Sequence, residues 1–353
     1  MYTRKKYKIR DMILWTRRET RFFIIIALSV TVLYELVGLR WLQVPWTPLA
    51  LVGTAVAFLI GFQSNAAYGR IWEARKIWGG IVNDSRTFGI QVIDMVTNEY
   101  CMEPMSADEL EAVKRKIVYR HIAWMTALRH AMRQERPWEV FRKAKTNQKW
   151  IDMMHVPEWE STLEDDLKPL LSMEEFEEVM TKTNKPAAIL KKQSTHLRLL
   201  KERGIIWEFS FLEMQGTLAA LIDHQGKSER IKNFPYPRQF ATLGYDFVNL
   251  FILLLPFGVV PEFSRIGASF VTEFPIIGSV FVWFGIPFTA MVSWVFNTMQ
   301  RIGTVGENPF EGSANDVPIS TISRGIEIDL REMLGEDNNS IPAQFPANYD
   351  VQM

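Results

Sequence analysis

This sequence has almost no cysteine and no excess of charge of either sign. Its 353 residues include one cysteine, Cys101, which excludes an intramolecular disulfide and leaves no cysteine pair for a zinc site. Lysine and arginine total 40, as do aspartate and glutamate, so no net field attracts a polyanion. We therefore expect no nucleic-acid partner and no disulfide-stabilised secreted domain.

The sequence also lacks the motifs of the common enzyme classes. No GxSxG turn, phosphate-cradling loop or cysteine with a nearby base is present. None of the histidines lies four residues from another, the spacing that would place two imidazoles on one helical face: His121, His130, His155, His196 and His224. We predict that the protein is not an enzyme, with no catalytic residue, no metal and no cofactor.

What the sequence does contain is long apolar runs, which cover residues 22–39, 45–70, 243–261 and 270–296. Each is at least as long as the ~18 residues that a helix needs to cross a ~30 Å hydrocarbon layer. The chain before the first run is rich in lysine and arginine, which is typical of a cytoplasmic flank. The pattern predicts four membrane spans with both termini in the cytoplasm.

Between the second and third runs the helical periodicity is amphipathic, and we predict an all-α protein. Ser106 with Glu109 forms a capping box, Ser172 precedes another helix, and Asn184 opens a third. Residues 135–166 have weaker periodicity and are predicted to be a peripheral excursion. The expected domains are a cytosolic N-terminal segment 1–21, membrane helices 22–78, a cytosolic helical domain 79–237, membrane helices 238–300, and a cytosolic segment 301–353 that is flexible at its end.

One face of the second run, with a helix expected at about 46–70, is unusual for a lipid anchor. At ~100° per residue, Thr54, Phe58, Phe62 and Asn65 fall within one arc. Such a face is better suited to water or to other helices than to lipid, so we interpret it as a pore wall. Phenylalanines four residues apart are also typical of buried helix contacts, so both interpretations stay open.

The run ends in three polar side chains, Gln63, Ser64 and Asn65, which we expect at the inner end of the pore helix. A single helix cannot shield an ion from hydrocarbon, so a pore needs several copies of the chain. The electropositive edges of phenyl rings can solvate an anion weakly, at ~1 kcal/mol per contact.

The stretch FLIGFQSNAAYGRIWEARKIWGGIVNDSR resembles the second membrane helix of bacterial bestrophin homologues, and NKPAAIL, ERIKNFPYP, LLLPFG and the NPF at 308–310 agree with that family in order and spacing. The resemblance implies a homopentamer around a central ion pore. Its neck would be formed by Thr54, Phe58 and Phe62, and a second, cytosolic aperture by Phe209.

Three departures from the family pattern qualify what the resemblance implies. Bacterial members commonly have Arg-Asn-Asn where this chain has residues 63–65, so a positive charge is missing. Thr54 is polar where an aliphatic residue is usual. Animal members carry a calcium-binding acidic cluster after NPFG, whereas this chain has only Glu311 and Asp316 there, so we expect no calcium site.

These observations predict a pentameric channel that passes small monovalent ions, with chloride as the expected ion. Its partners would be identical subunits, membrane lipid and the permeating ions. Two alternatives stay open: a sodium channel of the same architecture, and a non-conducting membrane scaffold that acts through its cytosolic helices.

Overall fold

The computed structural model describes residues 1–145 and 147–353, and these are folded almost entirely into helices. In the described residues, strand-like pairing is confined to the isolated bridges Tyr2–Val351, Val96–Ile206 and Asn348–Val351, which confirms the all-α prediction. The helices are α1 (Ile9–Glu35), α2 (Trp46–Met95), α3 (Ala107–Arg133), α4 (Gln148–Ile151), α5 (Pro157–Glu160), α6 (Leu163–Leu167), α7 (Met173–Met180), α8 (Lys185–Glu202), α9 (Glu208–Asn233), α10 (Arg238–Phe270), α11 (Pro275–Val280), the 3-10 helix η1 (Phe281–Phe284), α12 (Gly285–Val305) and α13 (Ile319–Met333).

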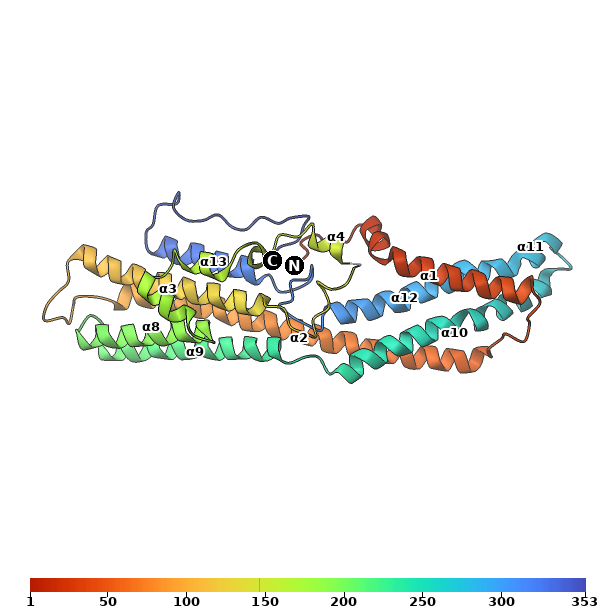
Figure 1. Ribbon diagram of the computed structural model, residues 1–353, viewed down its shortest axis with the longest axis horizontal. Helices are drawn as coiled ribbons and strands as arrows, with labels where there is room; N and C mark the ends of the chain where they lie inside the picture. Colours follow the sequence, from red (N-terminus) through yellow and green to blue (C-terminus); the bar gives the residue numbers. More distant parts are fainter. Residues whose placement is uncertain (146) are drawn as a thin grey trace.

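The molecule is a long rod with two halves, and α2 runs through both of them (Figure 1). Its 50 residues make a helix of about 75 Å at 1.5 Å per residue. We call α1, residues 46–70 of α2, and α10 to α12 the apolar half. We call residues 71–95 of α2, with α3, α5 to α9 and α13, the charged half. The two chain termini lie side by side where the halves meet.

The apolar half is built from helices with long hydrophobic runs. Three helical stretches are long and apolar enough to cross a membrane: Trp46–Met95, Arg238–Phe270 and Pro275–Val305. Helix α1 differs from its prediction, because it ends at Glu35 rather than near Leu39, and Gly38 then turns the chain at a φ of 78°. Its apolar part after Arg21 is therefore shorter than a span's ~20 residues.

The last two predicted spans also differ from the helices observed. Helix α10 continues to Phe270, so the residue at which the fourth run was expected to begin still belongs to the third helix. The fourth span starts at Pro275 and is made of three joined pieces, α11, η1 and α12. The hydrophobic runs in the sequence identified these two apolar stretches but did not show where the turn between them lies.

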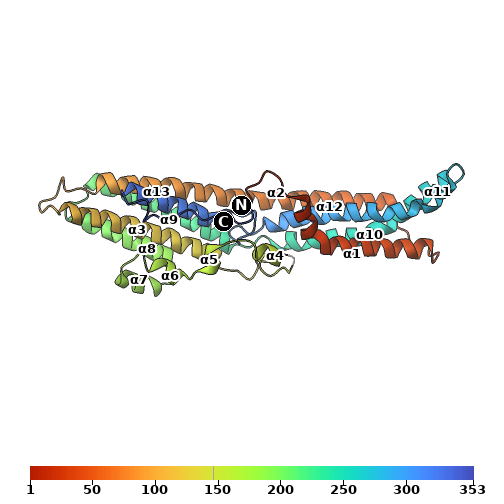
Figure 2. The ribbon, with the colours of Figure 1, turned by 90° about the horizontal axis from the view of Figure 1, so that it is seen from above.

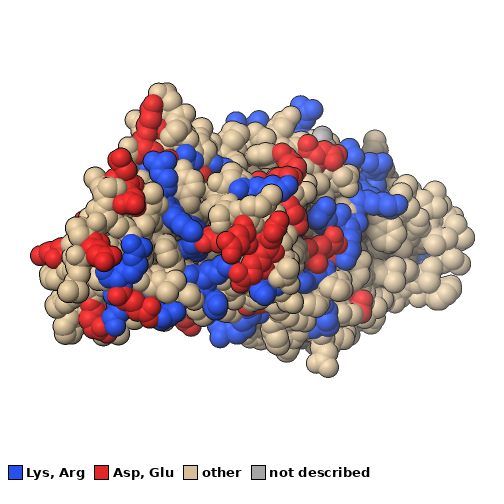
Figure 3. Space-filling model, turned by 60° about the vertical axis from the view of Figure 1, so that its left-hand side comes forward, with Lys and Arg blue, Asp and Glu red and all other residues tan. Residues whose placement is uncertain are grey.

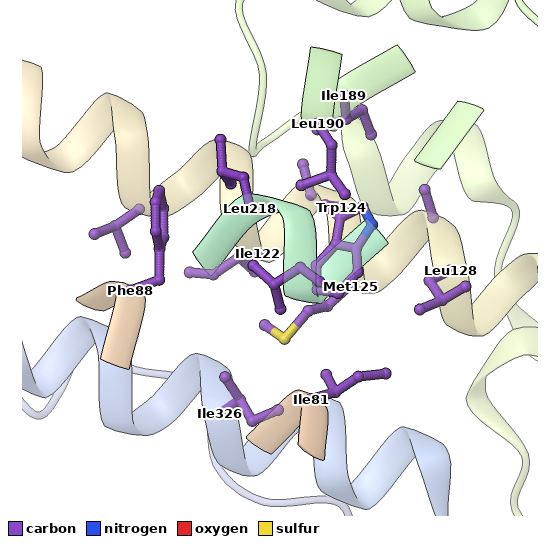
Figure 4. Close-up of a cluster of buried hydrophobic side chains, with 14 of the residues drawn as sticks. Ile81, Phe88, Ile122, Trp124, Met125, Leu128, Ile189, Leu190, Leu218 and Ile326 are labelled. Carbon is purple, nitrogen blue, oxygen red and sulfur yellow. The ribbon is translucent and has the colours of Figure 1, made fainter. Parts of the chain in front are cut away.

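The charged half surrounds one continuous hydrophobic core. Figure 4 shows Ile81 and Phe88 of α2 facing Ile122 and Trp124 of α3, with side chains from α8, α9 and α13 closing the cluster. The three predicted helix starts are confirmed. Ser106 accepts a hydrogen bond from Glu109 N in a complete capping box, and Ser172 and Asn184 cap α7 and α8 in the same way.

Two segments expected at the periphery make buried contacts. In the excursion 135–166, of which residue 146 lies outside the described residues, the side chain of Glu158 is buried and forms ion pairs with Arg129 and Arg133, the latter at 3.6 Å. The last residue of the sequence is also packed against the fold. Met353 is 3% exposed, and its carbonyl oxygen accepts a hydrogen bond from Thr321 Oγ1 at 2.6 Å.

The surface of the charged half carries both signs of charge. Figure 3 shows lysine, arginine, aspartate and glutamate side chains intermixed over this end and thinning out toward the apolar half. Many of them are paired, for example Arg86 with Asp329 at 2.7 Å. The two halves therefore present different surfaces to their surroundings, one polar and one hydrocarbon.

Candidate functional site

The face of α2 that was expected to line a pore is open in the folded chain. Thr54, Phe58 and Phe62 are all exposed, with 68% and 60% of the two phenylalanine side chains accessible. The opposite face is buried, and Val56 and Ile60 pack in a cluster with residues of α1 and α10. Within one chain, then, the two phenylalanines are not the buried helix contacts that their spacing also allowed.

The two rings form a defined pair. The centroids of Phe58 and Phe62 are 4.6 Å apart with their planes at 88°, so the edge of one ring meets the face of the other. Thr54 donates its hydroxyl proton to the carbonyl oxygen of Ala50 at 2.9 Å, within the helix. No atom lies within 4 Å of the position that a Cβ would take at Gly61, so this face has free space beside the rings.

The three polar residues at the inner end of this face do not act together. Asn65 is exposed, Ser64 is half-buried, and Gln63 is 2% exposed on the opposite side of the helix. Gln63 Nε2 donates to Glu307 Oε1 at 2.8 Å, which ties α2 to the segment after α12. Within one chain the three residues of the predicted polar end therefore point in different directions, because consecutive helical residues are 100° apart.

Glu307 is the main residue near this site that the sequence argument missed. Burial raises the pKa of its carboxyl group, while the hydrogen bond from Gln63 and the charges of Arg238 and Arg70 lower it. Gly244 of α10 lies so close that a Cβ there would be 2.6 Å from Gln63 Oε1. The signal that would have found Glu307 is its position directly before NPF, at the end of the last apolar run.

Phe209, the predicted cytosolic aperture, lies at the start of α9, far along the charged half from the α2 phenylalanines (Figure 1). Its side chain is 65% exposed, and its ring centroid is 4.7 Å from that of Trp207. Trp207 in turn stacks on Tyr100, with centroids 5.7 Å apart. The structure thus adds two aromatic neighbours that no sequence motif marked.

The carboxylate of Asp316 holds the loop that follows α12, and both of its oxygens accept hydrogen bonds. Asp316 accepts the backbone N–H groups of Phe310, Gly312 and Val317 at 2.7 to 2.8 Å, and Arg133 Nη1 at 2.8 Å. These bonds stabilise a turn in which Phe310 and Gly312 have positive φ. Asp316 therefore closes a loop between the two halves.

Glu311, the other acid of this loop, is buried and accepts a hydrogen bond from Phe141 N. Burial raises the pKa of Glu311 to about 7, and the nearby Glu139 and Asp316 add to that rise while Lys232 opposes it. Among the described residues, no group of three or more histidine, cysteine or acidic side chains is arranged to hold a metal ion.

Long apolar helices, an exposed aromatic face on one of them and a charged helical half together define a helical membrane protein. Residues 11–332 match the family described as bacterial/fungal bestrophin protein, and the chain belongs to that family. The resemblance seen in the sequence is thereby confirmed.

Individual relatives agree with the family assignment. The chain is 28% identical over 320 residues to a voltage-dependent anion channel-forming protein of Ralstonia nicotianae, covering 90% of this chain and 87% of that one. It is 23% identical over 356 residues to the voltage-dependent anion channel-forming protein YneE of Escherichia coli, covering 99% and 98%. The fold matches the crystal structure of a bacterial bestrophin homologue from Klebsiella pneumoniae with a TM-score of 0.68, at 21% identity over 90% of this chain and 98% of that one.

Proposed function

We propose that this chain is the subunit of a pentameric channel that passes small monovalent anions, chloride first, passively across the bacterial inner membrane. The observation that carries the proposal is the exposure of Phe58 and Phe62 on an apolar helix. Figure 2 shows α2 and α1 on opposite sides of the apolar half. If α1 faces lipid, the exposed face of α2 meets its own copies around a shared axis, and Thr54, Phe58 and Phe62 line the neck.

The proposed topology has four spans, with α1 as the first. Helix α1 packs beside α10 and α12, and its outward residues are apolar, including Ile25 at 60% exposed. Both termini lie where the charged half begins, which supports a cytoplasmic position for them together with that half. The membrane helices then lie within 22–78 and 238–300, and the cytosolic segments are 1–21, 79–237 and 301–353.

Chloride is proposed for two reasons. Relatives that cover most of this chain carry the name anion channel-forming protein. Phenyl edges at a dry constriction favour an anion over a cation, and each contact is weak enough to release it. Phe209 with its aromatic neighbours would form the second aperture at the far end of the charged half.

Sodium is the second candidate, because the neck side chains are uncharged and Gln63 stands where relatives commonly carry arginine. A salt gradient across a planar bilayer containing the purified protein separates the two. A reversal potential near the chloride equilibrium value supports the proposal, and one near the sodium value replaces chloride with sodium.

The neck is tested by flux from proteoliposomes. Phe58→Ala with Phe62→Ala widens and wets the constriction, so we expect chloride flux to rise several-fold. Phe22→Ala with Phe284→Ala removes two equally exposed rings from α1 and η1 and should leave flux unchanged. Absence of flux in every variant would support the scaffold alternative, and an equal rise in both pairs would show that α2 does not form the neck.

A further inference from the structure

A groove lies between α1 and α12, and all of its lining residues belong to these two helices. It encloses about 660 Å³. Its lining is both charged and apolar: Arg17 and Arg21 lie in the part of α1 nearer the charged half, and Ile24 of α1 with Ile286 and Pro287 at the start of α12 lie farther into the apolar half. The groove therefore offers cationic and apolar surface side by side.

The arginines of this groove have no counter-charge of their own. Arg17 and Arg21 are exposed, and within the described residues neither forms an ion pair; Arg21 Nε donates only to the carbonyl oxygen of Arg17, at 3.3 Å. Glu19, the carboxylate between them, pairs instead with Arg301 of α12 at 3.3 Å and does not line the groove. Arg17 also borders a second hollow whose lining includes Arg18, Lys145 and one acid, Asp11, so its charge is positive on balance.

With α1 as the first span of the proposed topology, the groove begins at the boundary between headgroups and tails. Arg21 is the last charged residue before the apolar part of α1, which begins at Phe22. The floor is held by a hydrogen bond from Trp294 Nε1 to Thr16 Oγ1 at 2.9 Å. Tryptophan and arginine at such a boundary are typical of the membrane interface, where basic pockets bind acidic headgroups.

We propose that this groove binds an anionic diacyl phospholipid of the cytoplasmic leaflet. Its phosphate lies between Arg17 and Arg21, and one acyl chain lies along Ile24, Ile286 and Met291. The proposal takes only the orientation of the chain from the proposed function, and it does not require that the protein conducts ions. Charge complementarity and the apolar continuation of the groove together select a lipid over a soluble anion.

The test is lipid binding to the purified full-length protein in detergent, measured by native mass spectrometry. Dioleoylphosphatidylglycerol competes there with dioleoylphosphatidylcholine. We expect the wild-type protein to retain phosphatidylglycerol preferentially. Arg17→Gln with Arg21→Gln should weaken its association about tenfold or more, since each basic residue near the headgroup contributes. Lys6→Gln with Arg10→Gln removes the same charge outside the groove and should change binding less than twofold.

A second variant tests the contact with the acyl chain of the lipid and leaves the charge of the groove unchanged. Met291→Trp fills the apolar end of the groove and should reduce binding of both lipids, and excess inorganic phosphate should not displace phosphatidylglycerol. Equal retention of the two lipids by the wild-type protein, equal loss in both charge variants, or displacement by phosphate would each overturn the proposal. Because the readout is mass rather than flux, a protein that binds the lipid but conducts nothing would refute the proposed function alone.

Discussion

Helix α2 passes through two surroundings, and its large side chains are placed differently in each. In the charged half Trp78, Ile81 and Phe88 are fully buried, whereas in the apolar half Phe58 and Phe62 are mostly exposed. Water drives apolar area into a core at about 25 cal/mol per Å². Lipid tails are as apolar as the side chains of a membrane helix, so no comparable force drives burial in the apolar half, and the rings of Phe58 and Phe62 stay open for the proposed neck.

The apolar half holds its helices together by close approach instead. A Cβ added at Gly53 would lie 2.8 Å from the ring of Phe251, and one added at Gly258 would lie 2.4 Å from the side chain of Leu49. Small residues that let helices touch are the usual device of membrane bundles. One half is therefore stabilised mainly by what it buries, and the other mainly by how closely its helices fit.

The largest difference in the free energy of unfolding is expected between replacing a buried tryptophan of the charged half and replacing an exposed one outside it. Trp124 is fully buried in the charged half and donates Nε1–H to Gln225 Oε1 at 2.9 Å. Trp124→Ala should lower the free energy of unfolding by about 3 to 5 kcal/mol through the cavity that it leaves. Trp41→Ala, at a site 74% exposed, should lower it by less than ~0.5 kcal/mol. Denaturant unfolding in detergent checks both, and equal losses would contradict the comparison.

A pH dependence is expected where the halves join. Burial raises the pKa of Glu311 from its ordinary 4.5 to about 7, so between these values the folded state holds the proton that the unfolded chain releases. Stability should therefore fall as pH rises through this window, by up to about 3 kcal/mol at 1.4 kcal/mol per pKa unit.

Glu311→Gln keeps the acceptor for Phe141 N–H but cannot ionise. The variant should be more stable than the wild type at pH 8 and about equal to it near pH 4, which thermal unfolding across pH 4 to 8 measures. Glu103→Gln, at an exposed site, serves as the control. A wild-type unfolding temperature that rises with pH over this range, unchanged by Glu311→Gln, would show that the carboxyl is not held neutral.

The smallest change in the free energy of unfolding is expected when glycines of the apolar half are replaced by alanine. A methyl group at Gly278 would lie 2.7 Å from Val271 Cα and 2.8 Å from the carbonyl oxygen of Gly267, so α11 would have to move away from α10. Gly278→Ala should cost about 1 to 3 kcal/mol. Gly61→Ala adds a methyl group to open space and should stabilise α2 by up to ~1 kcal/mol. Thermal unfolding in detergent gives both values, and the opposite order would refute close helix contact as the stabilising device.

Much of the fold could be predicted from the sequence because its signals are local. The capping residues Ser106, Ser172 and Asn184 each act within three residues of chain, and all three helices begin where expected. For the candidate site, helical spacing placed Phe58 and Phe62 on one face, and both are exposed together in the structure, whereas Gln63 of the predicted polar end is buried. The repeat of Val56, Ile60 and Gln63 at three and four residues already indicated the buried face.

Other features of the fold depend on contacts between residues far apart in the sequence, so local sequence patterns could not predict them. Glu307 follows Gln63 by more than two hundred residues, and Glu158 lies in a stretch with no clear period, so neither partner can be read from a window of sequence. The burial of Met353 likewise depends on α13 and the N-terminal segment meeting at the junction. Each of these contacts exists because two distant segments pack together, and periodicity carries no information about which segments those are.

The amino-acid order alone specifies the helices, the apolar runs that cross a membrane and the aromatic face of α2, because hydrogen bonding and side-chain period act over a few residues. The pairing of Gln63 with Glu307, the buried position of Glu158 and the groove beside Arg17 arise when helices far apart in the chain come together. Long-range packing selects those neighbours, since the free energy of each contact depends on the whole arrangement and not on its own stretch of chain.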